Sequence, residues 1–145
     1  MLATLRIYHD RVQALADEAE GLLRREGMAA LPRMGKLRVD QGVAMASYQL
    51  FVHRQVFEPL TRNGTPAQAE AAKRLKVECV IFSGTFCRYV QDWSKRDTAT
   101  HWHEYLPAAL GMVAAIRSHI ARVRDEIAPT FDAGVTGAVP VKAAR

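Results

Sequence analysis

The feature that most constrains this chain is the recurrence of apolar residues at steps of three and four along four long stretches. Such spacing places the apolar side chains on one face of an α-helix, because a helix has about 3.6 residues per turn. We find no run with the two-residue alternation of a half-buried β-strand. The sequence therefore predicts an all-α protein in which each helix buries one face.

The periodic stretches give approximate boundaries for the helices. We expect helices at about residues 2–26, 37–62, 66–96 and 100–128, with a loop over Met28–Lys36 because it contains Pro32 and Gly35. The predicted core stripes are Leu5, His9, Val12, Ala16, Ala19 and Leu23; Val39, Val43, Ala46, Leu50, His53, Phe57 and Leu60; Leu75, Cys79, Phe82, Phe86, Tyr89 and Trp93; and Trp102, Leu106, Ala109, Val113, Ile116, Ile120, Val123 and Ile127.

Local signals mark several helix ends. The pair Asn63-Gly64 is predicted to end the second helix, and Thr65 offers a capping hydroxyl just before Pro66 at the first helical position. Pro107 predicts either a late start or a kink in the fourth helix, and Pro129 is predicted to close it.

Together these elements predict one architecture. Four amphipathic helices with short connections are typical of an up-down-up-down four-helix bundle, here over residues 1–130. Residues 131–145 show no hydrophobic period and are predicted to form a flexible C-terminal tail.

Composition narrows the classes of protein. The chain has 145 residues, two cysteines and a net charge of +5, which indicates one domain without a disulfide scaffold. It has no apolar run of membrane-spanning length and no signal-peptide pattern, so we expect a cytoplasmic protein that does not enter membranes. Its basic residues are scattered and no recognition motif accompanies them, so nucleic-acid binding is not expected.

Histidines on or beside the core stripes are the most informative polar residues. Counting from each predicted turn places His9, His53 and His119 at about the same height, with Glu78 and Cys79 nearby on the third helix. Side chains on facing helices build the metal sites of helical bundles. Imidazole and carboxylate ligands suit iron, zinc or manganese.

The same residues have a purely structural interpretation. A buried neutral histidine often bonds to a carbonyl or hydroxyl group, which offsets the cost of removing it from water. On this interpretation Glu78 is a solvated residue or an ion-pair partner, and Cys79 is a small core side chain.

Three segments resemble the bacterial hemerythrin-like (HHE cation-binding) family. They are HRQVFEPL, KVECVIFSGTFCRYVQDW and WHEYLPAALGMVAAIRSHIARVRDEIAPTF, and the resemblance extends over about residues 5–130. It implies a hemerythrin-like bundle that binds iron, as one or two ions, in preference to zinc or manganese. Carried over residue by residue, the implied metal ligands are His9, His53, Glu78 and His119, with Gln49 and Cys79 as weaker candidates; Tyr48, next to Gln49, is a further residue that could reach the site.

The sequence also departs from the family pattern. Gln49 stands where a histidine is expected, His53 where a carboxylate is expected, and Val123 and Arg124 where an acidic ligand is expected. A single ion, an unusual diiron centre and no metal at all therefore stay open.

Two functions follow from these observations. The first is a hemerythrin-like iron-binding protein that binds or senses oxygen, nitric oxide or peroxide. The alternative is a metal-free helical bundle that acts as a protein-interaction or regulatory module, and a broad exposed apolar strip would favour it. Oxidase activity is not expected, because no Glu-x-x-His pair occupies core positions. The sequence does not determine the oligomeric state.

Overall fold

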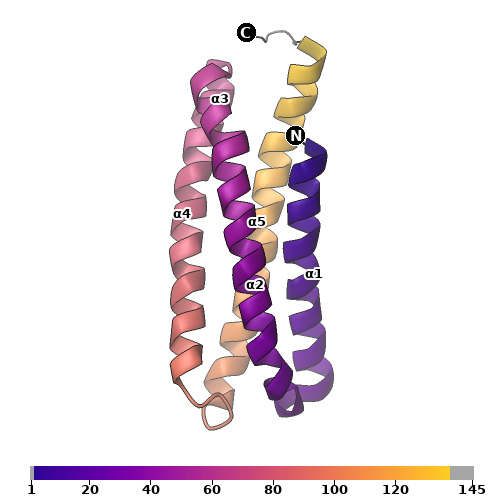
Figure 1. The fold of residues 1–145 in the computed structure, drawn as a ribbon, viewed down its shortest axis with the longest axis vertical. Coiled ribbons are helices and arrows are strands. Elements are labelled where there is room, and N and C mark those ends of the chain that lie inside the picture. The colour runs from indigo at the N-terminus through magenta and orange to yellow at the C-terminus, as the bar shows by residue number, and fades with distance from the viewer. Residues whose placement is uncertain (1, 138–145) are drawn as a thin grey trace.

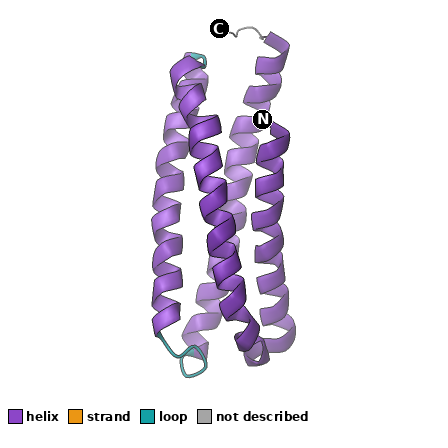
Figure 2. Cartoon of the chain, in the orientation of Figure 1, coloured by secondary structure: helices purple, strands orange, loops and turns teal. Residues whose placement is uncertain are grey.

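The protein is helical over every part of the chain that the structure describes. The computed structural model describes residues 2–137 and has no strand within that range (Figure 2). Its elements are α1 (Leu2–Glu26), the 3₁₀-helix η1 (Gly27–Ala30), α2 (Leu31–Val52), the π-helix η2 (His53–Phe57), α3 (Glu58–Asn63), α4 (Pro66–Lys95) and α5 (Trp102–Gly137). The predicted all-α class is confirmed.

The long helices pack side by side along their length (Figure 1). α1 contacts both α2 and α5, and α4 contacts α2, α3 and α5. Each long helix contributes large side chains that are fully buried, namely Leu5 from α1, Tyr48 from α2, Leu75 from α4, and Tyr105 and Ile116 from α5. The core therefore runs between these helices.

The connection between the first two long helices differs from the prediction. The expected loop over 28–36 is instead the short η1 helix followed directly by α2, which begins at Leu31 and not near residue 37. Pro32 lies in the first turn of α2, where a helix tolerates proline because its missing N–H would have no partner there. Gly27 has a φ of 57°, the left-handed conformation that ends α1 at glycine.

A π-helix interrupts the second rod. α2, η2 and α3 run on without a loop from Leu31 to Asn63, and the backbone N–H of Glu58 donates to the carbonyl of His53 across the π-turn. A π-turn inserts one extra residue into a helix, so the side chains after it are rotated relative to those before it. The predicted end of this rod at Asn63-Gly64 is confirmed.

This interruption overturns the predicted core stripe of the second helix. Val39, Val43 and Leu50 are exposed, whereas Phe57 from the same predicted stripe is fully buried. The core face of α2 consists of Met34, Leu37, Gln41, Ala44, Met45, Tyr48 and Val52. α2 has apolar residues on two faces. The predicted stripe follows the outer face, because Gln41 and the hydroxyl of Tyr48 interrupt the apolar pattern of the inner face.

α4 begins as predicted. The Thr65 hydroxyl accepts a hydrogen bond from the backbone N–H of Gln68, and the Gln68 side chain accepts one from the backbone N–H of Thr65. This capping box satisfies two N–H groups that the first turn leaves unpaired. The helix ends at Lys95, one residue before the predicted end.

α5 is longer than predicted. It extends from Trp102 to Gly137 and continues through both Pro107 and Pro129, so the expected end near residue 128 is wrong. Each proline removes one backbone hydrogen bond, and the buried side chains of Tyr105, Ala109 and Ile127 hold the neighbouring turns against the core. Of the predicted tail, residues 131–137 are helical and residues 138–145 lie outside the described part.

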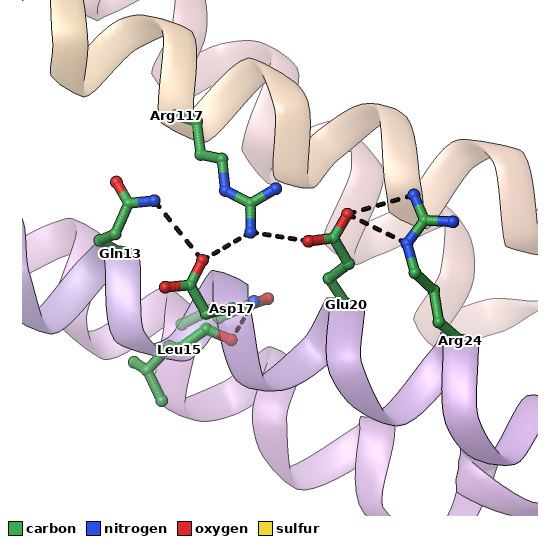
Figure 3. A network of polar contacts seen from close by, with 7 residues as sticks. Gln13, Leu15, Asp17, Glu20, Arg24 and Arg117 are labelled. Atoms are coloured by element: carbon green, nitrogen blue, oxygen red, sulfur yellow. Dashed lines mark hydrogen bonds and ion pairs between the residues drawn. The ribbon is translucent and has the colours of Figure 1, made fainter.

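An ion-pair network joins α1 to α5 on the surface (Figure 3). Arg117 of α5 donates to Asp17 at 2.5 Å and to Glu20 at 2.8 Å, and Arg24 also pairs with Glu20. Charge-assisted bonds of this kind fix geometry, although exposed pairs stabilise a fold only modestly.

Within the described helices, none has an apolar stretch long enough to span a bilayer.

The capping box gives a first testable prediction. We expect Thr65→Ala to lower the free energy of unfolding by about 1 kcal/mol, because a capping hydroxyl is lost. Urea denaturation followed by circular dichroism measures this change. Thr85→Ala is the matched control, since Thr85 is exposed inside the same helix and bonds only to the Ile81 carbonyl. An equal loss in both variants would contradict a capping role.

Candidate functional site

A buried polar cluster lies in the middle of the core. Among the described residues, the buried polar or charged side chains are His9, Gln41 and His119. Two of them contact the fully buried Tyr48: its ring centroid lies 5.1 Å from that of His9 and 5.7 Å from that of His119. Phe82 stacks on His119 with a centroid distance of 4.8 Å. One residue from each of α1, α2, α4 and α5 therefore forms a single aromatic layer.

Hydrogen bonding within this layer is incomplete. The Tyr48 hydroxyl and His119 Nε2 share a hydrogen bond of 3.0 Å. His9 Nε2 is buried and has no hydrogen-bond partner among the described residues. A buried imidazole nitrogen without a partner costs free energy, so His9 is the residue of this layer with an unused polar atom.

Burial keeps both histidines neutral. The pKa of His9 is lowered from 6.5 to about 4, mainly by burial, with smaller contributions in the same direction from His119 and Arg124 and an opposing one from Asp10. Burial lowers the pKa of His119 to about 4 as well, with smaller contributions from His53 and Arg122. Burial also raises the pKa of the Tyr48 hydroxyl well above 10. At neutral pH the layer therefore carries no net charge.

The layer differs from the predicted one at α2. We expected His53 opposite His9, but the structure places Tyr48 there. The reason is the early start of α2: a helix that begins at Leu31 instead of Leu37 brings an earlier residue to the height of His9. His53 is half-buried at the start of the π-helix, where its ring meets Phe57 edge to face at 5.3 Å. Burial lowers its pKa.

Of the candidates on α4, Glu78 forms an ion pair at the surface, whereas Cys79 lies in the core near Tyr48. The Glu78 carboxylate accepts from Arg122 Nε at 2.9 Å near the surface, so it serves as an ion-pair partner. Cys79 is fully buried, and burial raises the pKa of its thiol to about 12. Gln49 of α2 accepts a hydrogen bond from the Ser83 hydroxyl at 2.9 Å.

These positions test the fit of a metal. Over the described residues, His, Cys, Asp and Glu side chains nowhere form a group of three or more that could hold an ion. The set His9, His53, Glu78 and His119 is thus split between the aromatic layer, the π-helix and a surface ion pair. As positioned, these donors do not fit a mononuclear or diiron centre.

A second feature lies on the outside of α2 and α4. Six of the eight large apolar side chains that are exposed among the described residues belong to these two helices, and each is 55–65% exposed. They are Val39, Val43 and Leu50 on α2, and Val77, Val80 and Ile81 on α4. We call these six residues the α2–α4 face. Several exposed large apolar side chains on two packed helices favour an interaction surface.

A groove lies between α2 and α4. It has a volume of about 250 Å³ and is lined by Ala46 of α2 and Cys87 of α4, among others. Val43, Ala46 and Leu50 share one side of α2, because residues three and four apart are neighbours on a helix. Val80 and Cys87 are seven apart and likewise share one side of α4. None of the six residues of the α2–α4 face lines this groove; its apolar wall consists of Met45 and Ala46 of α2 and of Phe86, Cys87 and Val90 of α4.

Basic residues are exposed on the same elements as the α2–α4 face. Arg54, Lys73, Lys76 and Arg88 are exposed on the same rod and helix as the six apolar residues. Lys73 and Lys76 also line a shallow depression with Val77 next to the face. The chain as a whole has a net charge of +5. Acidic residues are present as well, since Glu58 lines the same depression and Glu70 is exposed on α4.

Comparison with known proteins adds no family. The chain matches no protein-family model, no curated protein and no solved structure at a significant level. The hemerythrin-like resemblance consequently stays a prediction from its sequence motifs.

The lowered histidine pKa values predict a pH-dependent stability. Above pH 6.5, His9 and His119 are neutral in both the folded and the unfolded chain. They therefore do not change the free energy of unfolding with pH in this range. Between pH 6.5 and about 4 the unfolded chain binds protons that the folded chain excludes, so stability falls. At pH 5 we expect a loss of about 2–4 kcal/mol relative to pH 7.5.

Urea denaturation at both pH values measures this loss. His119→Gln should remove about half of the pH dependence, whatever it does to absolute stability. His103→Gln is the control, because His103 is exposed, and it should retain the full dependence. If His119→Gln loses as much stability between pH 7.5 and pH 5 as the unsubstituted protein does, the assignment of this pH dependence to His119 is contradicted.

Proposed function

We propose that this protein is a metal-free helical interaction module that binds an acidic amphipathic helix of a partner protein through the α2–α4 face. We further propose that its scaffold is an up-down-up-down four-helix bundle and that it acts in the cytoplasm. The exposure of six large apolar side chains on two adjacent helices is the single observation that carries this proposal.

Exposed apolar area supplies the driving force. Removing apolar surface from water contributes about 25 cal/mol per Å². α2 carries apolar residues on its inner and outer faces, which is typical of a helix covered on both sides. The inner face is covered by the core, and a partner would cover Val39, Val43 and Leu50 on the outer face.

Geometry favours a helix as the partner. Apolar residues at Val39, Val43, Ala46 and Leu50 repeat with the spacing of a helix–helix seam. The adjacent groove is walled by Gly42 and Ala46, and small residues let a second helix approach closely. Amphipathic helices bind such grooves through anchors at three- and four-residue spacing.

Charge favours an acidic partner over a second copy of this chain. Arg54, Lys73, Lys76 and Arg88 are exposed on the same elements as the face. In a symmetric dimer these basic groups would repel their copies, whereas carboxylates on a partner helix would complement them.

A designed peptide tests this proposal directly. The probe is a fluorescein-labelled helical peptide with leucine on one face and glutamate on the other, and the control peptide replaces glutamate with lysine. We expect saturable binding of the acidic peptide only, weakening as salt increases. Leu50→Ser and Ile81→Ser should each reduce its affinity about tenfold in fluorescence anisotropy.

Ile7→Ser is the matched control variant, because Ile7 is equally exposed but lies on α1. It should bind the acidic peptide like the unsubstituted protein. Equal binding of both peptides, or no effect of Leu50→Ser, would contradict the proposal. A concentration-dependent dimer in sedimentation that Leu50→Ser abolishes would assign the face to self-association instead.

Iron binding by a hemerythrin-like protein that senses or binds a small diatomic molecule or peroxide is the second candidate. One observation favours it: His9 Nε2 is buried without a partner in the same layer as His119. It would require His53 and a carboxylate to move into this layer, because they lie outside it.

Elemental analysis separates the two candidates. After anaerobic loading with iron(II) and desalting, an iron-binding protein would retain about one or two ions per chain. His53→Ala would then release them, whereas His103→Ala would not. A protein that retains no iron under these conditions excludes the second candidate and leaves the first intact.

A further inference from the structure

A cavity between α1 and α5 lies apart from the α2–α4 face. Its volume is about 210 Å³, and residues from the first half of α1 and the second half of α5 line it. Leu5 and Ile120 are buried and give it an apolar wall, with Ala128 beside them. The cavity is therefore a partly apolar recess between two helices that pack directly on each other.

Two arginines stand at this cavity. Arg6 of α1 and Arg124 of α5 both line it, and Asp10 is the carboxylate beside them. Arg124 pairs with its neighbour Asp125 at 3.4 Å in an exposed contact, which holds a guanidinium only weakly. The charges on the wall sum to one net positive charge, which matches a ligand with a single negative charge.

His9 completes the wall. Its ring lines the cavity, yet the residue is only 6% exposed, and its Nε2 has no hydrogen-bond partner among the described residues.

We propose that this cavity binds a small monocarboxylate with an apolar body, its carboxylate held by Arg6 and Arg124 and its body packed on Leu5 and Ile120. The planar guanidinium group matches a carboxylate in two parallel hydrogen bonds. Because one end of the cavity is apolar, an organic acid fits the cavity better than a hydrated inorganic anion does.

The volume sets the size of the ligand. A dry apolar cavity of about 150 Å³ accommodates benzene. A cavity of about 210 Å³ therefore has room for a ring and one carboxylate group. Benzoate is the probe of this size and charge, and benzamide is its neutral counterpart of nearly equal shape.

Titration of ¹⁵N-labelled protein with benzoate tests the proposal. We expect saturable shifts confined to the first half of α1 and to the region of α5 around Arg124. Arg6→Ala and Arg124→Ala should each weaken binding about tenfold or more, which is the usual effect of losing a charged hydrogen bond. Arg25→Ala is the control, because Arg25 is exposed at the other end of α1 and does not line the cavity, and it should bind as the unsubstituted protein does.

Several results would overturn the proposal. They are shifts that do not saturate, equal binding of benzamide and benzoate, and an Arg124→Ala variant that binds normally. Both arginines are exposed, so these variants keep the fold, which circular dichroism verifies. The cavity shares no residue with the α2–α4 face, so the peptide and benzoate experiments succeed or fail independently.

Discussion

The π-helix His53–Phe57 determines which side of the second rod enters the core. Before it, Met34, Leu37 and Tyr48 face inward; within it, Val56 and Phe57 do so. An uninterrupted α-helix would keep Phe57 in line with Val39, Val43 and Leu50, since all four follow the same three-and-four spacing. The extra residue of the π-turn separates them. The separation of Phe57 from the outer apolar residues of α2 depends on this local distortion, whereas the start of α2 at Leu31 sets which of its residues reaches the height of His9.

The aromatic layer shows how the protein accommodates polar groups in its interior. His119 is fixed from two directions, by a hydrogen bond to Tyr48 and by stacking on Phe82. His9 packs against the same tyrosine without a bond at Nε2. Neutral histidines cost less to bury than charged ones, which is why burial shifts both pKa values downward. The layer therefore contributes a stability that depends on pH and gives the core a defined arrangement.

The two surfaces with proposed functions differ in chemistry. The α2–α4 face consists of six exposed apolar side chains on two helices, which suits a macromolecule. The recess at Arg6 and Arg124 is small and partly enclosed, which suits a small organic anion. Glu78, by contrast, is fully explained by its ion pair with Arg122, and Cys79 by its place in the core.

The sequence by itself determined the helical class, the helix end at Asn63-Gly64, the cap at Thr65 and the burial of His9, His119 and Cys79. These features depend on neighbouring residues along the chain or on regular spacing of apolar residues. Both can be identified from the sequence alone. The tertiary structure alone decided that Tyr48 instead of His53 faces His9, that Glu78 turns to Arg122, and that Val39 and Leu50 stay outside. Each of those outcomes depends on helix register, which is set by the start of α2 at Leu31 and by the π-turn. Both are settled by packing between helices, because the local sequence permits more than one register.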